Sequence, residues 1–263
     1  MRRIQFIELH EQPWLWSSVR DEITDALQFG LNLLNAYSPI APLLRAALDS
    51  TRSRAVVDLC SGGGGPWLSL IRHLGGDAED IRVLLTDKYP NLSSLRNAGV
   101  VEKQITYSPG PVDAMQVPCD VKGFRTMFTS FHHFPPEEAR AILQNAVDAG
   151  EGIAIFEITR RAFSTMVVML AWVFMLIVCA PWIRPFRWSR LLWTYVIPVI
   201  PFVLLFDGTV SCLRTYRLRE LREIVDGLNA SEYHWQIGEL SPSRVPITYL
   251  TGLPLRDGKS RQR

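Results

Sequence analysis

The clearest chemical signal in the chain is a run of four glycines, Gly62–Gly65, between a short apolar segment and a helical pattern. Glycine has no Cβ, so the backbone of such a turn can adopt positive φ angles and approach a bound molecule closely. The helix that follows offers unpaired backbone N–H groups to the same molecule. This order of strand, glycine turn and helix predicts a site for a nucleotide-like ligand.

The spacing of the glycines narrows the choice among NAD, FAD, a nucleotide and S-adenosylmethionine. A dinucleotide fingerprint needs glycines at its first, third and sixth positions. Counted from Gly62 or Gly63, the sixth residue is Trp67 or Leu68. The missing glycine normally lets the helix pack tightly on the strand, so its absence disfavours a dinucleotide. A phosphate-binding P-loop would end in Gly-Lys-Ser/Thr, and the chain has no such ending here.

The segment Asp58-Leu-Cys-Ser-Gly-Gly-Gly64 resembles motif I of class I S-adenosylmethionine-dependent methyltransferases, an acidic residue followed by a glycine-spaced turn. Cys60, a small residue, stands where the family usually has its first glycine. The resemblance implies S-adenosylmethionine as cofactor, with Asp58, Cys60, Gly62 and Gly64 at its methionine end. Asp58 would order the loop and approach the methionine amino group indirectly. A purely structural role, with its carboxylate bonded to loop N–H groups, is the compatible alternative.

Two aspartates after later strands resemble further cofactor-binding positions of the family. Asp87 ends the apolar run Leu-Leu-Thr-Asp, where a carboxylate can accept hydrogen bonds from both ribose hydroxyls. Its alternative role is that of a surface residue capping the next helix. Asp113 resembles the acid that receives the adenine amino group, with Ala114 and Met115 flanking the ring. For Asp113 the alternative is ordinary turn chemistry in a proline-rich loop.

His132 and His133 are the predicted catalytic residues. They lie in a Phe-His-His-Phe segment after the fourth predicted strand. A similar segment lies between cofactor and substrate in small-molecule methyltransferases. One imidazole could deprotonate an acceptor oxygen or nitrogen near neutral pH. Alternatively both rings only shape the loop, because methyl transfer is driven largely by alignment of the acceptor with the sulfonium.

Two weaker candidates complete the predicted site. Glu157 ends the fifth predicted strand, where it either binds a polar or cationic substrate group or pairs with Arg160 or Arg161. Trp14 and Trp16 near the N-terminus either close over the substrate or make ordinary packing contacts.

The elements that must position these residues alternate between strand and helix. Apolar runs predict strands at 56–59, 81–86, 104–107, 124–129 and 152–158. Helical patterns lie between them at 66–74, 90–98 and 136–147. Such alternation predicts a parallel sheet with helices on both faces. An amphipathic helix near 218–228 and strands at 233–240 and 247–253 follow. We therefore expect an α/β fold with a Rossmann-like, seven-stranded, mostly parallel sheet and an antiparallel last strand.

Composition divides the chain into four parts. We expect an N-terminal helical cap over 1–50 and a methyltransferase domain formed by 51–160 and 207–255. A hydrophobic, membrane-associating insertion occupies 161–206, and a basic tail follows at 256–263.

The insertion is the second informative feature. It carries no charged residue from 162 to 183, then Arg184, Arg187 and Arg190, and again none from 191 to 206. The first run is long enough to cross a bilayer, which takes about 20 apolar residues. The arginines of the connector, however, contradict a simple hairpin across the membrane. We therefore expect an inserted helical hairpin, re-entrant or in plane on the cytoplasmic leaflet, with its arginines reaching anionic headgroups.

Aromatic residues in the insertion resemble a belt at headgroup level. They are Trp172, Trp182, Trp188, Trp193 and Tyr195. The alternative is a hydrophobic lid that is buried on the domain or in a homodimer interface.

Charge and cysteine content limit the remaining function classes. The net charge of +2 over 263 residues is too small to favour nucleic acid. The four cysteines form no Cys-x-x-Cys pair, and no histidines show ligand spacing, which argues against a metal site or a disulfide framework. Charges near the N-terminus interrupt any signal-peptide core, so we expect a cytoplasmic location at the inner face of the membrane.

The sequence as a whole predicts an enzyme that moves a methyl group from S-adenosylmethionine to a small or lipid-like acceptor at the cytoplasmic membrane surface. A non-catalytic, membrane-anchored S-adenosylmethionine-binding or scaffold protein is the first alternative. A nucleotide-dependent oxidoreductase is the second, and the missing third glycine disfavours it.

Overall fold

A computed structural model describes residues 2–12, 14–75, 80–90, 103–241 and 246–255. Within these residues seven strands form one sheet in the order β3-β2-β1-β4-β5-β7-β6. The strands are β1 (Ala55–Asp58), β2 (Arg82–Leu85), β3 (Ile105–Tyr107), β4 (Phe124–Phe128), β5 (Ile153–Glu157), β6 (Tyr233–Leu240) and β7 (Ile247–Pro254). β7 alone runs antiparallel to its two neighbours, while the other pairs are parallel. The predicted sheet is confirmed, including its reversed last strand.

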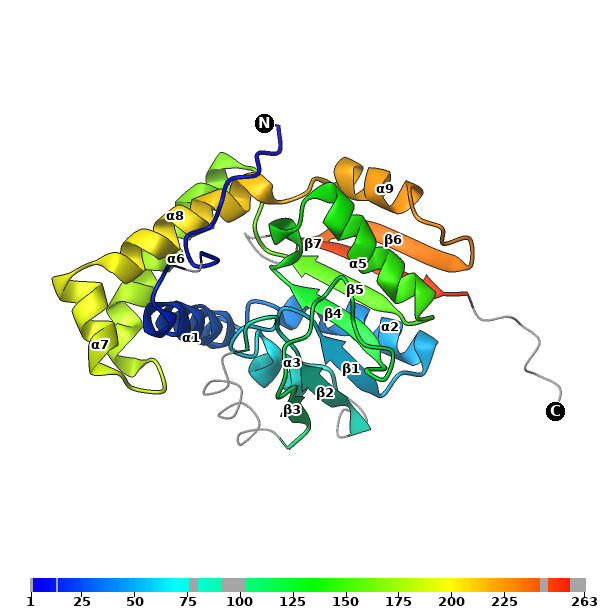
Figure 1. Cartoon of the computed structure of the whole chain (residues 1–263), viewed down its shortest axis with the longest axis horizontal. Coiled ribbons are helices and arrows are strands. Elements are labelled where there is room, and N and C mark those ends of the chain that lie inside the picture. The colour runs from blue at the N-terminus through cyan, green and yellow to red at the C-terminus, as the bar shows by residue number, and fades with distance from the viewer. Residues whose placement is uncertain (1, 13, 76–79, 91–102, 242–245, 256–263) are drawn as a thin grey trace.

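Helices cover both faces of this sheet (Figure 1). They are α2 (Ala41–Thr51), α3 (Trp67–His73), α5 (Pro136–Asp148) and α9 (Leu218–Asp226). Because side chains alternate along a strand, β5 sends Phe156 into the core with α2 and α3 and Ile155 into the core with α5 and α9. Every residue of β4 and β5 is buried, as expected of central strands covered on both faces.

The parallel register sets the position of the site. β4 pairs with β1 on one side and with β5 on the other. Residues that follow these three strands therefore meet at the carboxyl edge of the sheet, where open α/β sheets bind their ligands. The glycine turn follows β1, the His132–His133 segment follows β4, and Glu157 ends β5.

The remaining helices form a separate layer beside the sheet (Figure 1). They are α1 (Ser17–Leu33), α6 (Phe163–Cys179), the short α7 (Trp188–Leu191) and α8 (Val199–Arg214), with a π-helical turn at Leu192–Val196. α6 packs along α8, and α1 packs against both. The expected domain boundary at residue 206 falls inside α8, which continues to Arg214.

The connector between α6 and α8 corrects one expectation. Arg190 does not reach outward, because its buried guanidinium bonds Asp25 of α1 at 2.8 Å. It also donates to the backbone oxygens of Ile183 and Pro185 at 2.8 and 3.0 Å. Arg187 lies 3.6 Å from the same Asp25 carboxylate. Two of the three connector arginines therefore fasten the helices to α1 instead of facing lipid headgroups.

The expected N-terminal helical cap is only partly helical. The first helix begins at Ser17, and residues 3–12 run beside α8 in non-helical conformation (Figure 1). Their backbone groups bond to α8, for example Leu9 N and His10 N to Asp207 at 2.7 and 3.0 Å. We call residues 3–12 the strap. The helix expected at 90–98, from residue 91 onward, and the basic tail at 256–263 lie outside the described residues.

Candidate active site

Asp58 orders the glycine turn. Its carboxylate accepts hydrogen bonds from Thr126 Oγ1 at 2.6 Å and from Ser61 Oγ at 2.7 Å. Burial raises the pKa of Asp58 to about 7, against the opposing effect of these two hydrogen bonds. The turn adopts left-handed backbone at Cys60 (φ +56°) and Gly62 (φ +55°). The Asp58 carboxylate thus has a structural role, but its partners are hydroxyl groups and not the loop N–H groups that were considered. Cys60 takes a conformation that usually favours glycine.

Polar residues of α1 lie on the same turn. A Cβ on Gly62 would come within 3.3 Å of Thr24, and one on Gly63 within 3.1 Å of Gln28. Asn32 donates to Gly65 O at 3.0 Å and accepts from the backbone N–H of Ser69 at 3.0 Å. The sequence analysis missed this contact. A polar stripe at every fourth residue, Thr24, Gln28 and Asn32, was the available signal.

Asp87 lies against the glycine turn. Its two carboxylate oxygens accept hydrogen bonds from Gly62 N and Tyr89 N, each at 2.8 Å. The backbone oxygen of Asp87 accepts from Val112 N at 2.9 Å, which brings the Asp113 loop to the same edge. Each carboxylate oxygen of Asp87 keeps a lone pair that a ligand hydroxyl can use.

Asp113 makes the turn contacts that were its alternative role. Its carboxylate accepts from its own loop at Met115 N, at 3.0 Å, and pairs with Lys88 Nζ at 2.9 Å. Ala114 is buried and Met115 is half-buried beside it. The structure therefore brings Gly62, Asp87 and Asp113 to one edge of the sheet.

His132 and Glu157 form a buried pair at the same edge. His132 Nδ1 lies 2.8 Å from Glu157 Oε2, and the backbone N–H of His132 donates to Glu157 Oε1 at 3.1 Å. Burial raises the pKa of Glu157, but His132 outweighs it, and the net effect lowers that pKa. A carboxylate at Nδ1 favours the tautomer protonated there and leaves Nε2 as the basic nitrogen.

This pairing corrects one of the two roles considered for Glu157, the ion pair with Arg160 or Arg161. Its partner is a histidine, whereas Arg160 pairs with Glu239 at 2.9 Å and Arg161 pairs with Glu220. The reason is the register, because Phe128 of β4 lies opposite Phe156 of β5, so the residues after them are neighbours.

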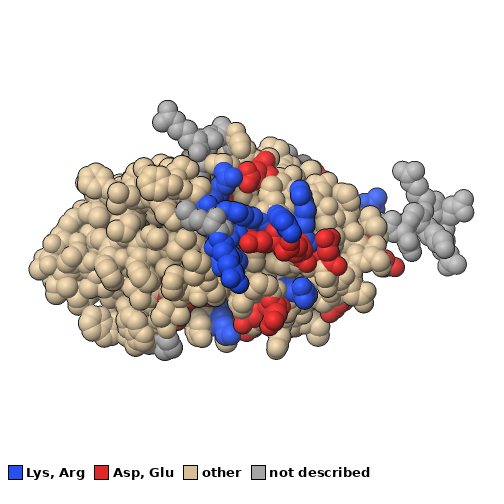
Figure 2. Space-filling view, turned by 90° about the horizontal axis from the view of Figure 1, so that it is seen from above, with Lys and Arg blue, Asp and Glu red and all other residues tan. Residues whose placement is uncertain are grey.

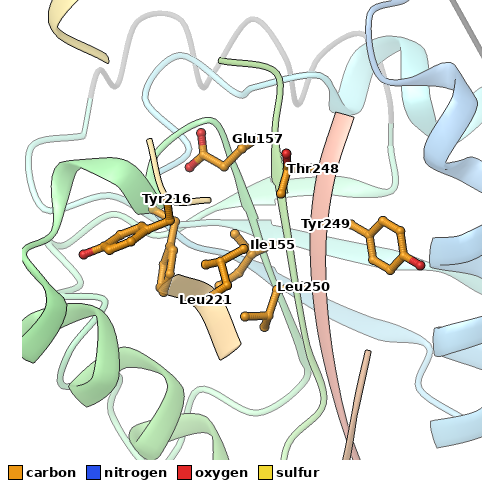
Figure 3. Close-up of a pocket in the computed structure, with 8 residues that line it drawn as sticks. Ile155, Glu157, Tyr216, Leu221, Thr248, Tyr249 and Leu250 are labelled. Carbon is orange, nitrogen blue, oxygen red and sulfur yellow. The ribbon is translucent and has the colours of Figure 1, made fainter. Parts of the chain in front are cut away.

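A small cavity lies behind Glu157. It holds about 10 Å³, room for one water molecule at most. In Figure 3, Glu157 and Thr248 lie at one end of this cavity, while Tyr249 points away across the sheet. Its other lining residues are apolar and packed, including Phe131, Ile155 and Leu250. His132 does not line this cavity.

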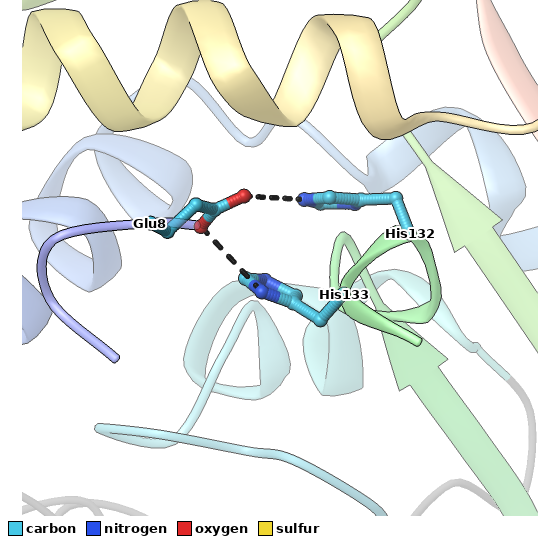
Figure 4. Close-up of side chains that lie close together, drawn as sticks. All are labelled: Glu8, His132 and His133. Carbon is cyan, nitrogen blue, oxygen red and sulfur yellow. Dashed lines mark ion pairs between the residues drawn. The ribbon is translucent and has the colours of Figure 1, made fainter. Parts of the chain in front are cut away.

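The strap covers the Nε2 side of His132. Glu8 Oε1 lies 3.7 Å from His132 Nε2, and Glu8 Oε2 lies 3.5 Å from His133 Nδ1 (Figure 4). Both the Glu8 and the His132 side chains are 1% exposed. His132 Nε2 has no hydrogen-bond partner among the described residues. Trp14 and Trp16 were the expected cover, but both are exposed, and Trp16 packs on Trp193 at 5.3 Å between ring centroids.

Carboxylates surround His133 and favour its protonated form. Burial lowers the pKa of His133, but Glu8 and a hydrogen bond to Glu11 outweigh it and raise the pKa. Burial also raises the pKa of Glu11, yet the contacts with His133 lower it to about 2. Arg214 lies 3.2 Å from both Glu8 and Glu11.

Three of the five histidines in the chain gather here, namely His10, His132 and His133. Together with Glu8 and Asp207 they place ligand atoms at metal-binding separations. Because these residues are distant in sequence, no ligand spacing could reveal the cluster. Arg214 and the protonation favoured at His133 supply positive charge for the cluster's carboxylates.

Comparison with known proteins identifies the fold. Neither family models nor curated proteins match this sequence. Among solved structures, the plantazolicin methyltransferase BpumL in complex with SAH superposes with a TM-score of 0.60 at 9% identity, over 93% of this chain and 94% of that one. The apo S-adenosylmethionine-dependent methyltransferase SibL gives 0.50 at 16% identity, over 85% and 57% of the two chains.

Human N-acetylserotonin methyltransferase in complex with SAM also gives a TM-score of 0.50, at 12% identity over 92% of this chain and 59% of that one. The chain therefore spans nearly all of BpumL but little more than half of SibL and of the human enzyme. Its fold is that of class I S-adenosylmethionine-dependent methyltransferases, as the glycine motif predicted.

Proposed function

We propose that this protein transfers a methyl group from S-adenosylmethionine to a small or lipid-like acceptor at the cytoplasmic surface of a membrane. The observation that carries the proposal is the His132–Glu157 pair, at 2.8 Å, on the sheet edge that also holds the glycine turn. A carboxylate-oriented imidazole beside a nucleotide-type site is what proton removal from an acceptor requires.

The described residues fit S-adenosylmethionine. The left-handed turn at Gly62 and Gly64 would hold the methionine end, and Asp87 would bind the ribose hydroxyls. The Asp113–Met115 loop would flank the adenine. When bound, the cofactor supplies an electrophilic methyl group on a sulfonium.

The protein's own contribution to the reaction is alignment, proton removal and exclusion of water. With S-adenosylmethionine bound, His132 Nε2 would accept the proton of the acceptor hydroxyl or amine, and the methyl group would pass from sulfur to that oxygen or nitrogen with release of S-adenosylhomocysteine. Glu157, buried and bonded to Nδ1, stabilises the resulting imidazolium and fixes the ring. Alignment in a closed, dry site contributes the larger part of the acceleration.

The membrane part of the proposal is supported by an apolar surface on the helical layer. A stretch of 18 residues within Phe163–Trp182 has a mean hydropathy of 2.4, yet only 17% of it is buried inside the protein. Figure 2 shows one end of the molecule almost without charge, next to a band in which Lys and Arg stand beside Asp and Glu. Exposed apolar residues of this layer include Phe163, Val167, Leu170, Phe174, Val178, Trp182, Trp188, Val196 and Phe202. We call this surface the apolar face.

An apolar face next to cationic residues fits an anionic membrane surface. Because α6 is covered on one side by α1 and α8, the helix lies on the bilayer in this proposal and does not span it. The same face could instead join two copies of the chain, and the experiment below separates these occupants. An acceptor dissolved in the membrane would reach the site along α8, which carries Phe202 at one end and Arg214 at the other.

Calorimetric titration tests the cofactor. We expect S-adenosylhomocysteine to bind and NADH not to bind, because the third glycine of the dinucleotide motif is missing. Asp87→Ala should weaken S-adenosylhomocysteine binding at least tenfold, since a charged hydrogen-bond acceptor is lost. Asp120→Ala, which removes an exposed aspartate, is the control. Binding of NADH alone would overturn the proposal, and binding of neither compound would favour a scaffold.

Vesicle flotation tests the membrane. We expect the full chain to float with vesicles of phosphatidylethanolamine and phosphatidylglycerol, and less with phosphatidylethanolamine alone. Light scattering coupled to size exclusion measures the oligomeric state of the same sample. A stable dimer that does not float would assign the apolar face to a second copy of the chain.

A further inference from the structure

We propose that the strap is a latch that keeps acceptors away from His132 until a membrane surface releases it. This inference rests on the proposed function and adds its regulation. It follows from where the strap lies, what holds it there and which residues it exposes.

The strap closes the site in this structure. Glu8 faces His132 Nε2 at 3.7 Å, and both side chains are 1% exposed. Arg3 donates to the backbone oxygens of His132 and Phe134 at 3.1 and 3.0 Å, and Gln5 donates to His133 O at 3.0 Å. No acceptor can approach Nε2 while these contacts persist, so turnover requires that the strap move.

The strap is held by α8. Asp207 accepts hydrogen bonds from Leu9 N at 2.7 Å and His10 N at 3.0 Å, and it bonds His10 Nδ1 at 2.9 Å. One turn further along, Ser211 Oγ donates to Glu8 at 2.9 Å. Arg214 lies 3.2 Å from Glu8 at the end of the helix. These contacts lie on the buried side of α8.

The opposite side of α8 belongs to the apolar face. Phe202 is 63% exposed, and Leu205 and Phe206 are exposed as well. Phe206 precedes Asp207 in the chain, so a shift of the helix on a lipid surface moves the residue that holds the strap. One short helix thus connects the proposed membrane contact with the cover of the proposed base.

The strap has the reverse of an ordinary surface pattern. Its polar residues, including Arg3 and Glu8, point inward to bond the site, whereas Ile4, Phe6 and Ile7 are 41%, 54% and 61% exposed. A ligand shifts an equilibrium only by binding one state better than the other. A released strap can bury Phe6 and Ile7 in the bilayer interface, which gives the membrane its preference for the open state.

Hydrogen exchange and histidine modification test the latch on the full chain. Without vesicles we expect slow exchange in strap peptides that contain Leu9 and His10, and slow reaction of His132 with diethylpyrocarbonate. Vesicles containing phosphatidylglycerol should accelerate the amide exchange and the His132 modification by about tenfold or more. Release of the strap breaks the hydrogen bonds to the Asp207 carboxylate that slow both reactions in the closed state. His234, which is exposed, reports reagent activity in the same sample.

Variants separate the latch from folding. Asp207→Asn should accelerate strap exchange and His132 modification without vesicles, whereas Thr209→Ala on the same helix should change neither. A paired Phe6→Ser and Ile7→Ser variant should still float with vesicles but keep the strap closed. Unchanged reactivity in Asp207→Asn would overturn the latch.

Failure of the latch and failure of the proposed function give different results. Flotation without any change in strap exchange would overturn the inference and leave the membrane proposal standing. If the wild-type protein does not bind S-adenosylhomocysteine, the proposed function itself is overturned.

Discussion

β5 and α6 are both strongly apolar, yet they differ in what covers them. All residues of β5 are buried, because helices lie on both faces of the sheet and strands lie on both sides. Of the 17 residues of α6, only Val173 and Leu176 are buried, because α1 and α8 cover one side alone. Hydropathy therefore identifies a segment that must avoid water, and the layers around it decide whether the protein itself provides the shelter.

Charged residues lie inside the protein in both regions. At the sheet edge, Glu157 and His132 satisfy each other and leave one nitrogen for chemistry. In the helical layer, Arg190 and Asp25 lie inside and join helices, while the aromatic side chains point outward. Polar groups thus form inner contacts of that layer.

The largest effect is expected at the catalytic edge. His132→Ala should lower turnover by a factor of about 10² to 10⁴, because a positioned base is lost. Binding of S-adenosylhomocysteine should stay within about twofold, since the ring contacts Glu157 and the strap and is not assigned to the cofactor site. Steady-state kinetics with any accepted substrate, combined with calorimetry, measures both quantities. Parallel loss of turnover and binding would show that the ring only shapes the loop.

His133→Ala is the matched comparison. Neighbouring carboxylates raise the pKa of His133 and so favour its protonated form, which cannot act as a base, and turnover should therefore fall less than in His132→Ala.

Two phenylalanine substitutions compare how much β5 and α6 contribute to the free energy of unfolding. Phe156→Ala in β5 removes a fully buried ring and should lower the free energy of unfolding by about 3–5 kcal/mol. Phe174→Ala in α6 removes a ring that is 67% exposed and should change it by less than about 0.5 kcal/mol. Denaturant titration measures both. Equal losses would mean that α6 is sheltered in solution, as in a dimer.

The inner charge pair of the helical layer gives a smaller but measurable loss. Arg190→Ala leaves Asp25 buried without its closest cation and should destabilise the protein by about 3 kcal/mol. Arg184→Ala, in the same connector but exposed, should have almost no effect. Thermal unfolding of the two variants checks the contrast, and similar melting temperatures would contradict it.

The smallest expected effect is a pH dependence of the stability that the contact between His133 and Glu11 of the strap contributes. The pKa of folded His133 lies above its ordinary value of 6.5, so its stabilising contribution is complete below about 6.5 and is lost as the pH rises through the raised value. Glu11 behaves oppositely, because its lowered pKa gives a contribution that is present above 4.5 and is lost toward pH 2. Unfolding free energies of wild type and His133→Gln should therefore converge as the pH rises from 6 upward. A constant difference would contradict this assignment.

Much of the fold could be predicted because its signals are local. Strand and helix periodicity placed the elements of the sheet within a few residues, and the glycine motif indicated the fold class. The predicted residues Asp58, Gly62, Asp87 and Asp113 do meet at one edge, since parallel strands bring their carboxyl ends together.

Contacts between distant segments could not be predicted in the same way. For Glu157 a substrate contact and a pair with Arg160 or Arg161 were both considered, but strand register paired it with His132. Arg190 was expected to face lipid, but Asp25 of α1 holds it inside. The strap was expected to be helical, but α8 provides its hydrogen-bond partners.

The sequence by itself determined which segments are strands, which turn can hold a nucleotide-like ligand and which helices are too apolar for water. Those properties depend on residues a few positions apart, whose periodicity and φ preferences are local. Only the tertiary structure decided that Glu8 covers His132, that Glu157 orients it and that the strap and the apolar face share α8. Such contacts join residues far apart in the chain, where no spacing rule applies and only packing selects the partner.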